Sequence, residues 1–297
     1  MARGVAHTTR EITLPRPYDA DRLFAFLAGR AIPTVETVEH LRDGWRYRRS
    51  IRLPAGAALG EITATDGAAR ITVQSLNDRD TSDALDALER VLDLASAPSL
   101  VDDALRGHPE SRDLIEQRPG LRVPRAADRP EVAFRALIGQ QVSVAAASTT
   151  CGFIAAEYGD RLPPTLCTSE INRLWPSPAV LASLDPATLR MPRAKATAVT
   201  TLAAALRDGE VDLTLPGADV RTQLLTLKGI GPWTAGYISM RACADDDVLL
   251  DSDLIARRGA SLIGLPSEPR ALRAAGERFA PWRSYLTMHL WSAYAAP

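Results

Sequence analysis

Residues 227–235 read LKGIGPWTA and place two glycines one residue apart, followed at once by a proline. Helix-favouring segments flank this stretch on both sides, so it predicts a tight turn between two helices. Glycine has no side chain, which lets the backbone at such a turn approach another molecule closely. Pro232 suits the first turn of the second helix. The free amides at that helix N-terminus, together with the positive end of the helix dipole, favour a bound phosphate.

A second informative stretch lies downstream, where residues 248–258 read VLLDSDLIARR and Asp253 follows Trp233 by 20 residues. A carboxylate at this position can act as a catalytic group. By the residues alone, one of positions 251–253 can equally cap the helix that begins near Leu254. The preceding acidic run at residues 245–247 is interpreted as a solvated loop. The glycine pattern at 227–235 resembles the helix-hairpin-helix motif, which holds a DNA backbone without reading its sequence, although a plain interhelical turn stays open for it.

The N-terminal part of the chain alternates apolar and polar residues, which predicts strands of a small antiparallel sheet. Turn-forming Gly, Asp and Pro residues separate the segments. Helical spacing of apolar residues at 21–30 and 85–92 predicts two helices beside this sheet. The strand segments lie at residues 11–14, 47–53, 61–63 and 70–73.

The chain becomes helical from about residue 100, with residues 134–158 as one long helical region and prolines marking later helix boundaries. The fold class is therefore α+β. We expect a flexible N-terminus at residues 1–8 and a sheet domain at 9–100. A helical body follows at 101–297, with the hairpin near 220–240.

Composition limits the possible functions. Hydrophobic residues make up 46% of the 297 residues, enough for a sizeable core. No apolar run approaches the roughly 18 residues of a membrane span, and residues 1–4 lack a signal-peptide pattern. The three cysteines have no CxxC spacing, which argues against a disulfide framework, a zinc site or an iron–sulfur cluster. With a net charge of −1, any contact with DNA must come from a local surface and from backbone amides.

Several further stretches are similar to the 3-methyladenine DNA glycosylase II family, the alkylation-repair branch of the helix-hairpin-helix DNA glycosylase superfamily. They follow the family's order over roughly residues 10–297. The resemblance implies a sheet domain followed by two helical subdomains that flank a cleft. The similar stretches are PYD at 17–19, FLA at 26–28, LIGQQVSV at 137–144, GIGPWTAGY at 229–237, PWRSY at 281–285 and HLW at 289–291.

This resemblance assigns catalysis to Asp253. Breaking an N-glycosidic bond builds positive charge on the sugar, and a fixed carboxylate stabilises that charge where water is excluded. Asp251 is the close competitor, two residues nearer to the hairpin than the family spacing. The chain is then expected to be a hydrolase that removes alkylated purines, of the 3-methyladenine and 7-methylguanine type, in base excision repair.

Aromatic side chains should recognise such bases, because an alkylated purine is cationic and cation–π attraction contributes roughly 0.5–2 kcal/mol when desolvated. The resemblance implies stacking positions at Tyr237 and Trp291 and pocket-wall positions at Trp233 and Phe26. The ordinary alternative for aromatic residues on helices is the core.

The resemblance implies two kinds of contact with duplex DNA: a side chain that fills the space left by the extruded base, and hairpin residues that bind the DNA backbone. Extruding a base costs a few kcal/mol, and a side chain fills the space that the base leaves. Gln141 stands where the best-known pattern has a leucine for this purpose, and it could equally be a polar surface residue. Leu254 and Ser292 replace tyrosines of the pattern, which implies a less aromatic pocket. The residues implied for the DNA backbone are Gly229, Ile230, Gly231 and Thr234.

The type of reaction follows from Trp233, which stands where strand-nicking relatives carry a lysine. An indole cannot form the Schiff base that nicking requires. Lys195 and Lys228 are the only lysines, and neither matches that position. The expected products are a free base and an abasic strand, which passes to downstream abasic-site repair enzymes.

We expect no cofactor and no catalytic metal, although a structural monovalent cation at the hairpin backbone is compatible with the motif. The expected partner is double-stranded DNA with alkylated bases, bound by a monomer in the bacterial cytosol and on the nucleoid, with no membrane association. A non-catalytic helix-hairpin-helix DNA-binding protein is the alternative. A small-nucleoside enzyme is a third possibility, but it needs a phosphate or ribose site that the sequence does not reveal.

Overall fold

The computed structural model describes residues 5–294, so residues 1–4 of the expected flexible N-terminus lie outside it. Strand β1 (Ala6–Thr13) begins within that expected segment, and residues 6–8 pair with β5 in the sheet. They belong to the strand because side chains along β1 alternate between half-buried and exposed, as in a strand with one face against a core.

The N-terminal domain is built on a five-stranded antiparallel sheet, which confirms the predicted sheet. Its strand order is β1-β5-β4-β3-β2, so each neighbouring pair except β1–β5 is consecutive in the chain. Strand β2 was not predicted, because its sequence ETVEHL holds only two apolar residues. The other strands are β2 (Glu36–Leu41), β3 (Gly44–Leu53), β4 (Gly56–Thr65) and β5 (Ala68–Ser75).

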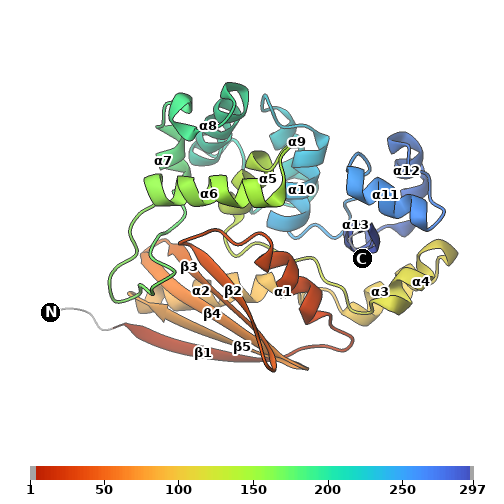
Figure 1. The fold of residues 1–297 in the computed structure, drawn as a ribbon, viewed down its shortest axis with the longest axis horizontal. Coiled ribbons are helices and arrows are strands. Elements are labelled where there is room, and N and C mark those ends of the chain that lie inside the picture. The colour runs from red at the N-terminus through yellow and green to blue at the C-terminus, as the bar shows by residue number, and fades with distance from the viewer. Residues whose placement is uncertain (1–4, 295–297) are drawn as a thin grey trace.

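Two helices pack on this sheet, α1 (Ala20–Ala28) and α2 (Thr81–Val91), with the short η1 (Asp78–Asp80) before α2. Helix α1 begins at Asp19, whose side chain accepts a hydrogen bond from the Arg22 amide. It buries Leu23 and Leu27 in the sheet domain, whereas Phe26 packs against the C-terminal helices. Helix α1 therefore joins the sheet domain to the helical body (Figure 1).

The first helical lobe, here called the middle lobe, shares one apolar core. The expected single helical region over residues 134–158 is wrong, because the chain turns at residues 139–143 between α5 and α6. Gln141 in this turn has a φ of 58°, and Ser143 caps the second helix through the Ala146 amide. The lobe contains α5 (Arg129–Ile138), α6 (Val144–Tyr158), α7 (Pro178–Ala182), η2 (Pro186–Leu189), α8 (Arg193–Asp208), α9 (Gly217–Leu225) and α10 (Pro232–Ala242).

The second lobe, the C-terminal lobe, is assembled from two separate parts of the chain. Helices α3 and α4 precede the middle lobe in sequence but pack against the last helices, on the far side of the molecule from α7 and α8 (Figure 1). The lobe contains α3 (Pro98–Arg106), α4 (Pro109–Gln117), α11 (Leu254–Leu262), α12 (Pro269–Gly276), η3 (Glu277–Phe279) and α13 (Arg283–Tyr294).

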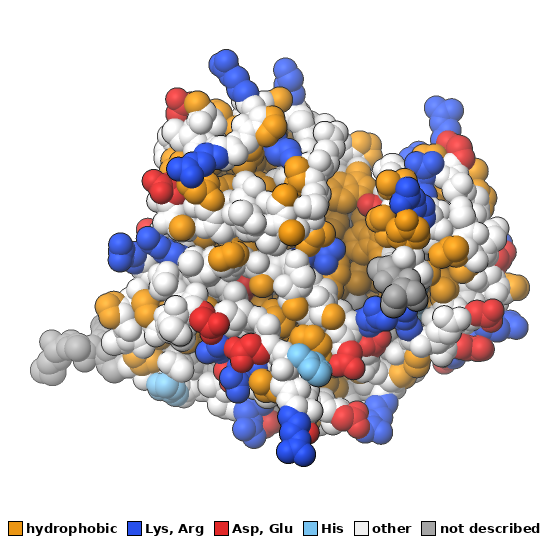
Figure 2. All heavy atoms as spheres, viewed as in Figure 1, with side chains coloured by type: hydrophobic (Ala, Val, Ile, Leu, Met, Phe, Trp, Pro, Cys, Tyr) orange, Lys and Arg blue, Asp and Glu red, His pale blue; other side chains and the backbone are white. Residues whose placement is uncertain are grey.

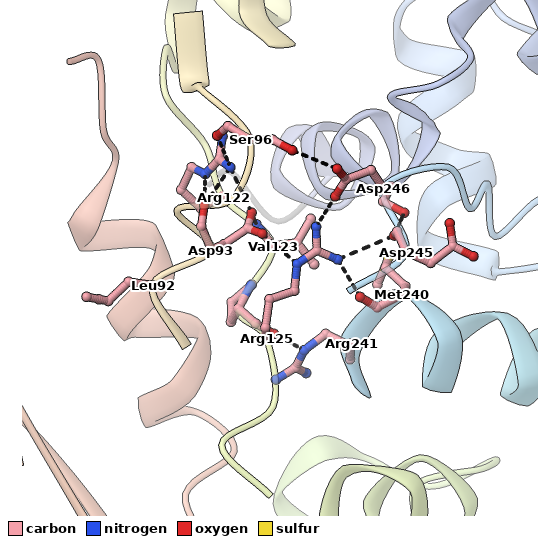
Figure 3. A network of polar contacts seen from close by, with 12 residues as sticks. Leu92, Asp93, Ser96, Arg122, Val123, Arg125, Met240, Arg241, Asp245 and Asp246 are labelled. Atoms are coloured by element: carbon pink, nitrogen blue, oxygen red, sulfur yellow. Dashed lines mark hydrogen bonds and ion pairs between the residues drawn. The ribbon is translucent and has the colours of Figure 1, made fainter. Parts of the chain in front are cut away.

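A buried ionic network ties the sheet domain to both lobes (Figure 3). Asp93, just after α2, accepts from the Arg125 Nε at 2.6 Å, and Arg125 also pairs with Asp246. The acidic run at 245–247 is thus not a solvated loop, because each of its carboxylates pairs with an arginine: Asp245 with Arg221, Asp246 with Arg125 and Asp247 with Arg283. Removing one partner from such a buried pair would leave an uncompensated charge, so this network holds the three units in register.

Candidate active site

A cavity of about 550 Å³ lies where the sheet domain and the two lobes meet. Helix α1 lines it from the sheet domain, α10 from the middle lobe, and α11 and α13 from the C-terminal lobe. Hydrophobic side chains line a recess between the two lobes, and Lys and Arg side chains project from both lobes beside it (Figure 2).

The four aromatic residues predicted for a pocket all line this cavity and contact one another. Trp233 stacks on Tyr237 with ring centroids 5.4 Å apart, and Tyr237 lies 6.2 Å from Trp291. Phe26 completes the row, stacked 6.4 Å from Trp291. Three separate helices contribute these rings, so they form a wall that spans the junction of the three units.

Asp253 lines the same cavity and is held by three hydrogen bonds. It is the N-cap of α11, where its Oδ1 accepts from the Ala256 amide at 2.8 Å. The Trp291 indole donates to the same oxygen at 2.9 Å, and the Trp233 indole donates to Oδ2 at 2.9 Å. Capping therefore does not exclude the catalytic interpretation, since the cap orients the carboxylate while the indoles hold it against the aromatic wall.

Asp251, the competing carboxylate, has a different environment. Its side chain is nearly buried, forms an ion pair with Arg273 at 2.5 Å and does not line the cavity. Salt-bridge formation occupies the oxygen that would otherwise be free for chemistry. Of the two candidates, Asp253 alone faces the aromatic wall.

The helix-hairpin-helix consists of α9, the turn at 226–231 and α10. Gly229 has a φ of +96°, and a Cβ there would lie 2.7 Å from the Ala198 Cβ, so this glycine is needed by the fold. Gly231 is the N-cap of α10, and a Cβ there would have nothing within 4 Å. Among residues 5–294 the amides of Gly231, Trp233 and Thr234 find no hydrogen-bond partner. The start of α10 thus has amides without partners, next to the open space at Gly231.

Two side chains predicted for DNA contact turn inward instead. Ile230 is only 6% exposed and packs in the core of the middle lobe. Thr234 is 2% exposed, and its hydroxyl accepts a hydrogen bond from the Gln140 Nε2 at 2.6 Å. These residues can contact a DNA strand only through their backbone, because their side chains are committed to the fold.

Gln140 was not among the predicted site residues, although it connects the hairpin to the turn at 139–143. Besides Thr234, its Nε2 donates to the Gly229 carbonyl at 3.3 Å. The Lys195 Nζ donates to the carbonyls of Ile138 and Gln140, at 3.1 and 2.5 Å. The turn that carries Gln141 is therefore fastened to the hairpin, a relation that no sequence spacing indicates.

Gln141 itself is exposed at the tip of that turn. Beside it Val142 and Val144 are 46% and 43% exposed, and both line the cavity. These two valines were not predicted as site residues; their signal would have been apolar side chains in a turn. Of the two departures from the family pattern, Ser292 lines the cavity, whereas Leu254 is 54% exposed and does not.

Two guanidinium groups stand at the end of the wall formed by Phe26 and Tyr237. The guanidinium carbon of Arg30 lies 3.6 Å from the Phe26 ring centroid, and that of Arg241 lies 4.7 Å from it. The Arg241 Nη1 donates to the Tyr237 hydroxyl at 2.7 Å. Burial lowers the pKa of both arginines. Burial also opposes ionisation of Tyr237, but Arg241 and Arg30 outweigh it and lower the pKa of that hydroxyl below its ordinary value.

Neither lysine lines the cavity. Lys195 is occupied by backbone carbonyls, and Lys228 is exposed on the hairpin turn. Within residues 5–294 no cluster of three or more His, Cys, Asp or Glu side chains is arranged to hold a metal ion. In the same part of the chain, no helix combines the length and apolar character needed to cross a membrane.

Comparisons with known proteins agree with the resemblance. The model of the AlkA N-terminal domain matches residues 9–128. The chain is 38% identical over 284 residues to the Mycobacterium tuberculosis protein named "Probable bifunctional transcriptional activator/DNA repair enzyme AlkA". The matched region covers 95% of this chain but 56% of that protein, so the chain spans little more than half the length of this relative. Escherichia coli DNA-3-methyladenine glycosylase 2 is 36% identical over 289 residues, covering 93% of this chain and 94% of the relative.

The solved structure of a 3-methyladenine DNA glycosylase from Archaeoglobus fulgidus superposes with a TM-score of 0.80. It covers 96% of this chain and 98% of that one at 21% identity, which supports the fold. The identity to the E. coli protein extends over nearly the whole of both chains. The chain therefore belongs to the AlkA family of DNA-3-methyladenine glycosylases.

Proposed function

We propose that this protein is a monofunctional DNA glycosylase that hydrolyses the N-glycosidic bond of alkylated purines in base excision repair. The observation that carries the proposal is the Asp253 carboxylate, held by the indoles of Trp233 and Trp291 inside an aromatic cavity. Family membership supports the same reaction, as the E. coli relative is named DNA-3-methyladenine glycosylase 2.

In the proposed mechanism the bond between the sugar carbon and the base nitrogen breaks, and its electron pair leaves with the base. The sugar carbon becomes positively charged, and the Asp253 carboxylate stabilises this charge from within a site that excludes bulk water. A water molecule then adds to the sugar carbon and releases its proton to the solvent. Asp253 can also orient this water, since a carboxylate accepts hydrogen bonds.

The damaged base must first leave the helix stack, at a cost of a few kcal/mol. We assign the grip on the strand to the free amides at the start of α10, where a phosphate would meet both the donors and the positive helix end. Gln141, exposed on the turn that Gln140 fastens to the hairpin, would fill the space left by the base. The rings of Tyr237 and Trp291 would then receive the base in the cavity.

The proposed reaction ends with a free base and an intact abasic strand. Trp233 stands at the position of the lysine in strand-nicking relatives, and neither lysine lines the cavity. Downstream abasic-site enzymes would complete the repair. We further propose that the protein works as a monomer on duplex DNA in the bacterial cytosol, and that any cation at the hairpin backbone is structural.

The test compares two isosteric variants, Asp253→Asn and Asp251→Asn, for release of free bases from randomly methylated duplex DNA. We expect Asp253→Asn to lower the rate on the order of 10²-fold or more, the effect of removing one electrostatic stabiliser. Its DNA affinity should be retained or increased, because the carboxylate faces the reacting sugar rather than the phosphates.

Asp251→Asn should keep its rate, apart from the stability lost with the Arg273 ion pair. Near-full activity of Asp253→Asn together with an inactive Asp251→Asn would show that the wrong carboxylate has been chosen. DNA binding without base release by the native protein would indicate a non-catalytic helix-hairpin-helix protein.

A further inference from the structure

The end of the aromatic wall at Phe26 carries positive charge that no carboxylate balances. Among residues 5–294 neither Arg30 nor Arg241 forms a salt bridge. Arg135, which also lines the cavity, differs in this respect: it pairs with Glu36 at 2.8 Å and with Glu131 at 3.0 Å. Burying a charge without a partner of opposite charge costs free energy of folding. Charged groups in such surroundings are often found at functional sites.

Arg30 and Tyr237 both have donors to spare toward the cavity that they line. The Arg30 side chain donates a long hydrogen bond, 3.3 Å to the Phe26 carbonyl, and the neighbouring Tyr237 hydroxyl partly offsets the lowering of its pKa by burial. The Tyr237 oxygen accepts from Arg241, and its own proton finds no acceptor in the same part of the protein. A base lying against Tyr237 and Trp291 would therefore have a guanidinium and a hydroxyl near its edge.

The unpaired guanidinium of Arg30 has opposite effects on the binding of two classes of damaged base. A base that carries a fixed positive charge, such as 3-methyladenine in DNA, is repelled by an unpaired guanidinium in a low-dielectric cavity. A neutral base with a carbonyl on its edge, such as hypoxanthine, offers the acceptor that a planar guanidinium binds well. Asp253 forms no ion pair with Arg30 or Arg241 in the described chain, and its carboxylate accepts hydrogen bonds from the two indoles instead.

We propose that Arg30, backed by Tyr237 and Arg241, is a specificity-determining residue that binds the acceptor edge of neutral damaged bases and weakens binding of cationic ones. This inference rests on the proposed glycosylase function and identifies the substrate classes between which the site discriminates.

The assignment also fits removal of alkylated purines. A cationic base leaves readily as a neutral molecule, so it needs no help at its edge and tolerates weaker binding. A neutral base must accept the electron pair of the broken bond and gains from a donor that stabilises the resulting negative charge. Arg30 thus brings the rates for the two classes closer together and widens the range of bases removed.

The experiment measures two single-turnover rates on the same enzyme preparation. One is release of 3-methyladenine from randomly methylated duplex DNA, and the other is release of hypoxanthine from a duplex with one deoxyinosine. Their ratio does not depend on the fraction of folded enzyme, so partial misfolding of a variant does not disturb it. The variants are Arg30→Met, Arg30→Lys and, as a matched loss of charge away from the cavity, Arg79→Met in η1.

We expect Arg30→Met to raise the ratio of 3-methyladenine to hypoxanthine release by about tenfold or more, the effect of one lost bidentate contact to a base. Arg30→Lys keeps the charge but loses the planar donor pair, so its ratio should fall between those of the native protein and Arg30→Met. Arg79→Met should leave the ratio unchanged.

An unchanged or lowered ratio in Arg30→Met overturns the inference, as does a native protein that releases 3-methyladenine but no hypoxanthine. In both cases the proposed glycosylase function stands. If the native protein releases neither base, the proposed function and the inference fail together.

Discussion

The side chain of Asp253 accepts three hydrogen bonds, and two of them come from indole groups that line the same cavity. The backbone donor is the ordinary cap of α11, whereas the indoles approach from α10 and α13. Because both carboxylate oxygens are held, the group is fixed in one orientation before a substrate enters. A fixed charge needs little reorganisation during the reaction, which is the basis of its stabilising effect.

Each indole donor can be removed while an aromatic ring, smaller than the indole, is kept at the position. In Trp233→Phe and Trp291→Phe we expect single-turnover base release to fall about ten- to hundredfold, the range for losing one hydrogen bond to a charged group. Affinity for undamaged duplex should hold, because neither indole faces the hairpin amides. The rate is measured as free base released with enzyme in excess.

Trp282→Phe is the matched control, since Trp282 is half-buried in the same lobe but does not line the cavity. If both indole variants keep the native rate, the carboxylate does not depend on its indole donors for orientation. Equal losses in all three variants would indicate general destabilisation rather than a role in holding Asp253.

At the scale of single residues, the aromatic residues and the carboxylate that the sequence grouped together do line one cavity, whereas the directions of some other side chains were not predicted. The spacing from the hairpin to Asp253 and the aromatic positions depend on the linear order of residues, which the sequence contains. The inward turn of Ile230 and Thr234 depends on packing against the middle lobe, which the sequence does not contain. Arg30 gave no signal, as its role arises only from its position over Phe26.

At the scale of elements, the two hairpin glycines have different tasks. Gly229 adopts a left-handed φ and lies against Ala198, whereas Gly231 faces open space at the start of α10. The first glycine is therefore needed to build the hairpin. The second leaves room for a molecule that approaches the free amides.

This difference predicts opposite phenotypes for two alanine variants. Gly229→Ala should lower the free energy of unfolding by about 1–2 kcal/mol from the backbone alone, with an added cost from the contact with Ala198. Gly231→Ala should unfold like the native protein but bind duplex DNA on the order of tenfold more weakly, to a similar degree with and without damage. Thermal unfolding and duplex titrations check the pair.

A Gly231→Ala variant that loses only its discrimination between damaged and undamaged DNA would contradict the assignment of the hairpin to phosphates. A Gly231→Ala variant that unfolds as readily as Gly229→Ala would show that both glycines serve the fold alone.

Helices and strands with a strong periodicity of apolar residues were predicted. Boundaries that depend on the backbone conformation of a single residue were not. The expected helix over 134–158 breaks because Gln141 takes a positive φ, which favours glycine and is rare for glutamine. The Ser143 cap of α6 was a readable sign of this break. The acidic run at 245–247 was wrongly predicted for a different reason. Three adjacent acidic residues are typical of a solvent-exposed loop, and their arginine partners are distant in sequence.

At the scale of the whole molecule, the site exists only because three units meet. The sheet domain supplies Phe26 and Arg30, the middle lobe supplies Trp233 and Tyr237, and the C-terminal lobe supplies Asp253 and Trp291. The network of Figure 3 connects these units through buried ion pairs. A chain with a net charge of −1 can still meet DNA here, since basic side chains stand beside the recess (Figure 2).

The most direct test of the whole account is an analysis of the products from randomly methylated duplex DNA incubated with the native protein. Free bases are identified by chromatography, strand integrity is followed before and after alkali, and a parallel sample is treated with borohydride. We predict free methylated purines, strands that break only after alkali, and no trapped protein–DNA adduct, since Lys195 and Lys228 lie outside the cavity. Strand breaks without alkali, together with a borohydride-stable adduct that is lost on changing either lysine, would contradict hydrolysis assisted by Asp253.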